Sequence, residues 1–357
     1  MKSILYRFKR RLALTAYFIV CIMVSTTIQA QDRKAEKDST AVQDSTAQDS
    51  TAQDSTESRT VKIKPVKNTF ESIWIIDNQT VLVPIKGTFE MDIMHRFGTV
   101  TKGYPDFWGF FAPSNIRLAV AYAPINKLYL GFGITKGNML WDGSAKYSII
   151  TQTPGKYPVS VSYYANMAYD SRKDEDNSLF KYSSDRYSFF NQILIARKIT
   201  EKLSLQIAPS VSHQNSVNGY YTKNDSTGQE IFRDMKWDQF AVALSGRYKL
   251  TEVTSVMLNY DQPITKHATR NPDPNLSFGL EFNTSNHSFQ LFVGNYSYLN
   301  PQRNNLFNQN SPFSYDDKTK THSNLNTDNP ETEKDEGTRV KGGQFVIGFN
   351  ITRLWNY

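Results

Sequence analysis

The sequence contains almost no cysteine, and this excludes two classes of site. Cys21 is the only cysteine among 357 residues, and it lies in a segment that we expect to be removed on export. The mature chain therefore has no thiol for a disulfide or a thiolate metal site. Metal motifs such as H-E-x-x-H are absent as well, and Asp316–Asp317 lacks the spaced carboxylates of a calcium loop. We expect no metal and no cofactor.

Long apolar runs are also missing. The run Leu12–Val24 has 13 residues, fewer than the roughly 20 that a membrane-spanning helix needs. It follows a basic stretch and precedes TTIQA, so residues 1–30 are predicted to be a signal peptide cleaved after Ala30. A retained anchor helix is the alternative. Lipidation of Cys21 is disfavoured because FIVC has no small residue just before the cysteine.

The net charge of +7 comes largely from this leader, which carries five basic and no acidic residues. Without it the balance is 7 − 5 = +2. The rest of the chain has no basic cluster in a nucleic-acid motif. We therefore expect no nucleic-acid partner.

Residues 31–60 nearly repeat the unit DSTAQ. Such a segment has too few apolar side chains to offset the entropy lost on ordering, so we interpret it as a disordered linker. Its Asp-Ser-Thr triplets resemble an O-glycosylation motif of exported Bacteroidota proteins, and a linker without sugar is the alternative. The acceptor serines of that motif would be Ser39, Ser45, Ser50 and Ser55.

Residues 61–85 are more apolar, with ESIWIID as a short amphipathic stretch. This segment is predicted either to pack at the periplasmic mouth of the following domain or to enter it as a plug. The pattern leaves both possibilities open.

From residue 86 to residue 357 the hydrophobic pattern has a period of two. In NIRLAVAYA, for example, Ile116, Leu118 and Val120 share one face, whereas Arg117 and Ala119 share the other. A soluble sandwich also alternates in this way. However, the runs are about as long as the roughly 9–11 residues of a tilted membrane strand. Short connections also alternate with long ones, which is typical of short periplasmic turns and long extracellular loops.

These features predict an all-β fold: a transmembrane antiparallel up-and-down β-barrel of about twelve strands. An even number of strands places both ends of the barrel chain on the periplasmic side. The expected strands are 87–97, 115–123, 127–136, 140–152, 157–168, 186–198, 202–213, 239–250, 253–262, 275–284, 287–296 and 343–355.

The last strand, GGQFVIGFNITRLWNY, places aromatic and aliphatic residues on one face up to the final residue. Such an ending resembles the C-terminal signal that the outer-membrane barrel assembly machinery recognises, although a tyrosine replaces the more usual phenylalanine. The residues that would form this signal are Phe349, Ile351, Trp355 and Tyr357.

Several stretches resemble an uncharacterised family of Bacteroidota outer-membrane β-barrel proteins. They are VPIKGTFEMDIMHRFGTV, SNIRLAVAYAPINKLYLGFG, FNQILIARKITEKLSLQIAPSVSH, ALSGRYKLTEVTSV and FVIGFNITRLW. The resemblance implies a location in the outer membrane of a Gram-negative bacterium, with outer-membrane lipids and the assembly machinery as partners. It implies no catalytic residue.

Charged residues of both signs fall on the polar face. On a lipid-facing side each Lys or Arg would cost roughly 2–4 kcal/mol at the midplane, so we expect these residues to line the lumen. They would either create a transverse field that sorts small solutes or pair into a network that fills the barrel. The lumen-lining candidates are Glu90, Asp92, Arg96, Arg117, Lys146, Arg247 and Glu281.

The expected function is therefore a small porin-like channel with a mixed-charge lumen, not an enzyme. The first alternative is a non-conducting barrel that acts as a scaffold or a surface-binding protein. A lipid hydrolase is a further alternative, with His213 near Ser210 and Ser212 as its candidate group, although adjacent strand residues face opposite ways. The polar 297–341 loop is expected to stay mobile at the cell surface. Its alternatives are to fold inward as a plug, to contact a partner, or only to shield the rim.

Overall fold

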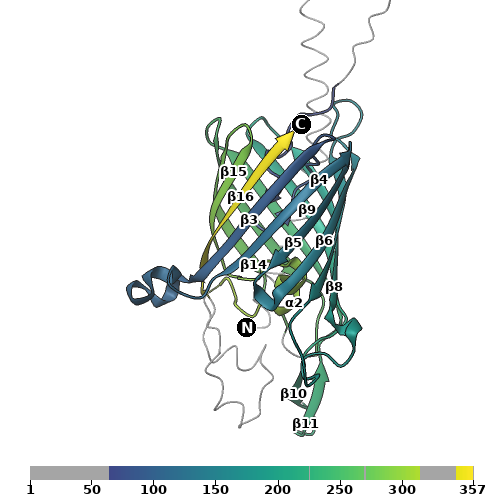
Figure 1. Cartoon of the computed structure of the whole chain (residues 1–357), viewed down its shortest axis with the longest axis vertical. Helices are drawn as coiled ribbons and strands as arrows, with labels where there is room; N and C mark the ends of the chain where they lie inside the picture. Colours follow the sequence, from purple (N-terminus) through teal and green to yellow (C-terminus); the bar gives the residue numbers. More distant parts are fainter. Residues whose placement is uncertain (1–63, 225, 269–270, 314–342, 357) are drawn as a thin grey trace, which may run out of the picture. The chain divides into compact units, whose positions relative to one another are not determined.

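The computed structural model describes residues 64–356, except residue 225, residues 269–270 and residues 314–342 (Figure 1). The predicted signal peptide, the DSTAQ linker with its four serines, and Tyr357 lie outside the described residues. They remain predictions.

The chain divides into two compact units. The described part of the first consists of residues 64–67 and Thr151–Val159. The backbone N–H of Val66 donates to the carbonyl of Gln152 at 2.7 Å, and Thr153 and Tyr157 form an isolated antiparallel bridge. The second unit, Asn68–Ile150 with Ser160–Tyr357, contains all of the features discussed below.

A closed antiparallel barrel of twelve strands forms this second unit, which confirms the predicted fold class. The last strand pairs with the first, because Phe349 lies opposite His95 and Asn356 opposite Thr88. In chain order the barrel strands are β3 (Thr88–Thr99), β4 (Asn115–Ile125), β5 (Leu128–Thr135), β6 (Leu140–Ile150), β7 (Ser160–Asp170), β8 (Tyr187–Lys198), β9 (Leu203–Gln214), β12 (Asp238–Lys249), β13 (Thr254–Pro263), β14 (Asn275–Asn283), β15 (His287–Gly294) and β16 (Val346–Asn356).

The alternating pattern of the sequence appears as alternating burial. Along β4, Arg117, Ala119 and Ala121 are buried, whereas Leu118 and Val120 are exposed. A soluble β-protein would bury the aliphatic side chains and expose the arginine. The reversed arrangement, with an apolar outside, fits a barrel surrounded by hydrocarbon.

Connections of different length separate the two ends of the barrel. The turns after β4, β8, β12 and β14 are short, and they define the short-turn end, where β3 begins and β16 finishes. At the long-loop end, η1 (Val100–Lys102) and η2 (Tyr104–Gly109) follow β3, η3 (Gly137–Met139) follows β5, and η4 (Ser183–Arg186) precedes β8. The loop after β9 holds an unpredicted hairpin of β10 (Gly219–Lys223) and β11 (Glu230–Asp234).

The 297–341 loop differs from the mobile surface loop that we expected first. Residues Pro301–Phe307 form a helix, α2, in which Gln302, Asn304, Asn305 and Leu306 are buried. The inward-folding alternative therefore describes this part of the loop, while residues 314–341 lie outside the described residues. Across the described part of the chain, no helix combines the length and the apolar character that crossing a membrane requires.

Residues 69–83, which we call the lumen segment, fold into the barrel of the same unit. They contain a minimal hairpin of β1 (Trp74–Ile75) and β2 (Asn78–Gln79), paired antiparallel. The hairpin turns at Ile76 and Asp77, and Ile76 adopts a φ of 61°, a conformation that a β-branched residue rarely tolerates. The plug interpretation of this segment stays a prediction.

Candidate functional site: the barrel lumen

Two glutamines of the barrel wall hold the backbone of the lumen segment. Gln206 on β9 donates from Nε2 to the carbonyl of Gln79 at 2.8 Å and accepts from the N–H of Val81 at 3.1 Å. The amide of Gln206 thus pairs one backbone carbonyl and one backbone N–H of this arm of the hairpin. The arm has few neighbouring strands that could pair them instead. Buried backbone groups need such partners, because an unpaired one costs about 1–3 kcal/mol.

Gln290 on β15 does the same for the other arm. Its Nε2 donates to the carbonyl of Trp74 at 2.7 Å, and its Oε1 accepts from the N–H of Ile76 at 3.1 Å. Asn350 on β16 adds a donation to the carbonyl of Ile76 at 2.6 Å. In these contacts the main chain of the hairpin bonds to side chains of the wall, so they do not depend on which side chains the hairpin carries.

The tip of the hairpin points toward the long-loop end. Asp77 forms an ion pair with Arg96 on β3, whose side chain is 0% exposed. Asn78 donates to Asn259 at 2.9 Å and to Asp261 at 2.8 Å, both on β13. Because the tip carries one negative charge against a buried guanidinium, removing the tip would leave that guanidinium without its carboxylate.

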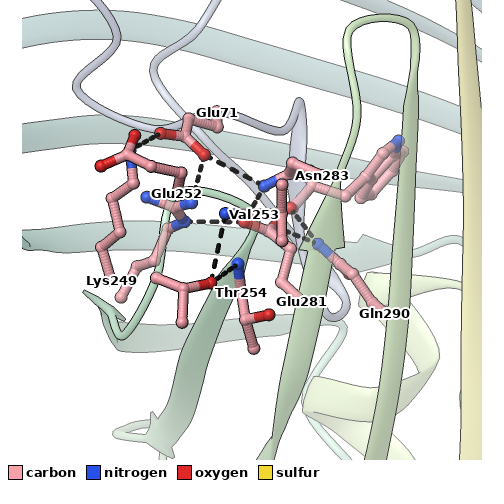
Figure 2. Close-up of polar contacts among 11 residues, drawn as sticks. Glu71, Lys249, Glu252, Val253, Thr254, Glu281, Asn283 and Gln290 are labelled. Atoms are coloured by element: carbon pink, nitrogen blue, oxygen red, sulfur yellow. Dashed lines mark hydrogen bonds and ion pairs between the residues drawn. The ribbon is translucent and has the colours of Figure 1, made fainter.

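The base of the lumen segment lies near the short-turn end, where Glu71 meets the wall (Figure 2). The carboxylate of Glu71 forms ion pairs with Arg247 and Lys249 of β12, the latter at 3.4 Å. It also accepts from Asn283 at 3.3 Å. Arg247 in turn donates from Nε to Glu281 at 2.6 Å, so one guanidinium joins the wall to the lumen segment.

A second cation contacts the returning arm. Lys146 on β6 is fully buried, and its Nζ donates to Oε1 of Gln79 at 2.6 Å and to the carbonyl of Thr80 at 3.1 Å. Nearby, Glu90 accepts from the hydroxyl of Tyr129 at 2.8 Å. These bonds replace the water that an exposed ammonium or carboxylate would otherwise bind.

Further contacts involve three charged residues of the wall, Asp92, Arg117 and Asp142. Asp92 accepts from the indole N–H of Trp74 at 3.0 Å and from Thr352 at 2.7 Å. Arg117 and Asp142 form a two-bond pair within the wall at 3.0 and 2.6 Å. Paired bonds of this kind are the strongest geometry for a guanidinium and a carboxylate.

All seven lumen-lining candidates lie on the buried face: Glu90, Asp92, Arg96, Arg117, Lys146, Arg247 and Glu281. Sequence reasoning missed the groups that hold the lumen segment, Gln206 and Gln290. On their strands they occupy the same polar register as many other residues. No local signal could have distinguished them.

The helix α2 brings amides to the long-loop end of the lumen. Gln302 donates to Oδ1 of Asn166 on β7 at 2.8 Å, and Asn305 donates to Oγ of Ser212 on β9 at 3.4 Å. Asn300 caps the helix by accepting from the N–H of Arg303 at 3.2 Å. The lumen is thus occupied from both ends, by the lumen segment and by α2.

His213, the histidine of the hydrolase alternative, lies on the outer face. Its Nδ1 is 2.8 Å from Oδ1 of Asp238, and its Nε2 is 3.0 Å from Oδ1 of Asn215. Ser212 points the other way and is fully buried. The ring therefore contacts a carboxylate and an amide rather than a nucleophilic hydroxyl.

Three residues of the expected C-terminal signal, Phe349, Ile351 and Trp355, lie on β16, between Val346 and Asn356. Phe349 and Ile351 are partly exposed and flank the buried Asn350. Trp355 lies 5.6 Å from Phe89 of β3 between ring centroids. Recognition of this C-terminal signal by the assembly machinery stays a prediction.

Comparison with known proteins agrees with the fold. The chain belongs to the family described as "Membrane bound beta barrel domain (DUF5777)", whose model matches residues 70–355. The match begins within the lumen segment, so that segment is part of the family's domain. No curated protein matches the chain.

Three solved structures that match the chain are only distantly similar to it. A structure of the porin NanC is 9% identical, with a TM-score of 0.40 over 75% of this chain and 99% of that one. An outer-membrane channel from Pseudomonas putida F1 is 12% identical, with a TM-score of 0.39 over 77% and 97%. The Pseudomonas putida toluene transporter TodX is 8% identical, with a TM-score of 0.32 over 78% and 91%. Similarity this low carries no argument about function.

Proposed function

We propose that this protein is a gated outer-membrane barrel, closed as folded by the lumen segment. Solutes pass only when that segment leaves the lumen. The observation that supports the closed state is the pair of glutamine contacts, Gln206 to residues 79 and 81, and Gln290 to residues 74 and 76. They bond the hairpin to wall side chains that face the lumen, where an open porin has water.

The chemistry of the wall supports the channel part of this proposal. The inner face carries charged groups such as Arg96, Lys146 and Glu281. Burying charges costs several kcal/mol per ion, so a permanent core is built at least as stably from apolar residues. A charged lining is useful when water and solute enter the lumen.

Two interpretations of these charges were open from the sequence: a transverse field and a filling network. The contacts of Asp77 with Arg96 and of Glu71 with Arg247 favour the network in the closed state. When the lumen segment leaves, both arginines lose a carboxylate partner and face the pore. The mixed-charge field then belongs to the open state.

A non-conducting scaffold is the second candidate, and α2 favours it. Even without the lumen segment, Gln302 and Asn305 still place the helix against β7 and β9. If α2 alone seals the barrel, the protein is a closed support for its surface loops, including the β10–β11 hairpin.

Conductance in planar bilayers tests the proposal. The full chain is compared with a variant in which residues 69–83 are replaced by a flexible Gly/Ser linker of the same length. We expect rare openings from the full chain and frequent discrete steps from the variant. Equal conductance of the two would contradict closure by the lumen segment. A folded but silent variant would support the scaffold instead.

The cellular setting belongs to the same proposal. We infer that the chain is exported with a leader cleaved after Ala30 and is inserted by the barrel assembly machinery. It would then reside in the outer membrane of a Gram-negative bacterium. The sequence patterns support each step, and each step suits a membrane-bound barrel. Small solutes would be its transported partners.

A further inference from the structure

The loop between β3 and β4 presents an unusual group of exposed aromatic rings. Within Tyr104–Gly109 and the two residues after it, the exposed fractions reach 76% for Tyr104 and 78% for Phe111. Phe107, Trp108 and Phe110 are also exposed. We call these five residues the aromatic loop. Exposed apolar groups of this size mark interaction sites.

The backbone of the aromatic loop is held in a defined conformation. Phe107 and Trp108 adopt φ angles of 44° and 52°, which L residues rarely adopt. The N–H of Trp108 donates to the carbonyl of Gly103 at 2.8 Å, and the N–H of Phe111 donates to that of Asp106 at 3.3 Å. Such strain persists only where surrounding contacts impose it, and it is a recurring mark of function.

Two glycines fix the base of the loop against the barrel. A Cβ on Gly109 would lie 2.4 Å from the carbonyl oxygen of Gly98, so only glycine allows this approach. Val100 adds a donation to the carbonyl of Phe345 at 2.8 Å. The rings are thus displayed on a fixed base rather than on a loose end.

The aromatic loop continues the apolar outer face of the barrel. Phe110 lies 4.5 Å from Phe97 between ring centroids, Phe97 lies 4.3 Å from His95, and His95 stacks on Phe349 at 5.1 Å. In Figure 1 this loop projects sideways from the lower end of β3, whereas the β10–β11 hairpin continues downward. Asp106 is the only charged residue between Gly103 and Ala112.

We propose that the aromatic loop is a lateral anchor that inserts its rings into the lipid leaflet at the long-loop end. Tyrosine and tryptophan favour the membrane interface, because their rings pack with lipid while their polar atoms reach water. Continuity with the outer face selects lipid as the occupant rather than a soluble partner. The anchor would fix the depth and tilt of the barrel at this end.

Site-specific fluorescence tests the anchor. Single cysteines are introduced as Tyr104→Cys or Phe111→Cys in a Cys21→Ser chain and labelled with an environment-sensitive dye in phosphatidylcholine vesicles. These two side chains are the most exposed of the five, so their loss leaves the base of the loop intact. The matched control is Tyr221→Cys on β10, whose side chain is 53% exposed.

Brominated phosphatidylcholine should quench both loop labels more strongly than the control, and aqueous iodide should quench the control more strongly than the loop. Iodide quenching of the loop labels equal to that of the control would overturn the proposal. Protection from both quenchers would overturn it as well, since a protein would then cover the rings.

Discussion

Gln206 on β9 and Gln290 on β15 bond the two arms of one hairpin. Three strands, β12, β13 and β14, lie between β9 and β15 in the barrel wall. Each glutamine donates to a carbonyl and accepts from an N–H of the lumen segment. The barrel wall thereby takes the place of the neighbouring strands that a two-residue strand lacks. This relationship makes the lumen segment a separable part with a small number of main-chain contacts.

The double variant Gln206→Ala/Gln290→Ala should open the barrel more often than the wild type does. It leaves two N–H and two C=O groups of the hairpin without wall partners, at about 1–3 kcal/mol for each buried unpaired group. Single-channel recording measures the open fraction. Gln192→Ala is the matched control, because Gln192 is equally buried but, among the described residues, its side chain donates to the side chain of Asn78 rather than to the hairpin backbone. An open fraction no higher than that of the control would refute this role.

Removing the charge at the hairpin tip should destabilise the fold more than removing the charge at its base. Asp77→Asn leaves the buried Arg96 without a carboxylate, and we expect a loss of about 3 kcal/mol in the free energy of unfolding. Glu71→Gln should cost less, because Arg247 keeps its bond to Glu281. Urea unfolding in lipid vesicles compares the two. The reverse order would contradict the assigned pairs.

Alanine should destabilise the barrel at one glycine and be tolerated at another. A Cβ on Gly279 would lie 2.3 Å from the carbonyl oxygen of Leu291, so Gly279→Ala should lose about 1–3 kcal/mol through overpacking. A Cβ on Gly143 meets nothing within 4 Å, so Gly143→Ala should be tolerated. The yield of folded barrel and the urea midpoint measure both. Equal effects would mean that the packing around β14 differs from that described.

Acid should weaken the loop that holds His267 at the long-loop end. Burial, assisted by the charge of Lys236, lowers the pKa of His267 to about 4. Its Nδ1 accepts from the N–H of Lys236 at 2.8 Å, a bond that the protonated ring loses. The unfolded chain binds this proton near pH 6.5, so the stabilisation is complete above that pH and is lost as the pH falls toward 4.

Hydrogen exchange of residues 264–268 between pH 7 and pH 4, corrected for intrinsic rates, follows this change. His267→Gln should remove most of the pH dependence. A loop whose protection stays constant over that range in the wild type would contradict the lowered pKa.

The barrel could be predicted from the sequence because its signal is local. Apolar and polar residues alternate along a strand, as Leu118 and Val120 do with Arg117. This alternation indicates the two faces of the strand without any information on the neighbouring strands. The lumen segment has no such period, and several of its partners come from strands more than a hundred residues away, as with Val81 and Gln206. The sequence therefore left its position open between the mouth and the lumen.

The remaining differences have the same cause. The helix α2 is short and rich in asparagine and glutamine, so composition predicted a solvated loop. Its amides instead donate to an amide oxygen of Asn166 and to the hydroxyl of Ser212, and the helix is buried there. The β10–β11 hairpin lies in the long connection after β9. From its length alone, this connection was predicted only to be a loop. The aromatic loop is visible in the sequence as YPDFWGFF, but its exposure depends on the contact between Gly98 and Gly109.

Thiol accessibility tests most directly whether residues 69–83 occupy and close the lumen. Ile73, 0% exposed, is replaced in an Ile73→Cys/Cys21→Ser chain and exposed to a water-soluble maleimide in lipid vesicles. Tyr221→Cys in the same background gives the rate for an exposed site. We predict that Ile73→Cys stays protected and becomes reactive when Gln206→Ala and Gln290→Ala are added. Labelling of Ile73→Cys as fast as Tyr221→Cys, in an otherwise folded barrel, would contradict closure of the lumen by residues 69–83.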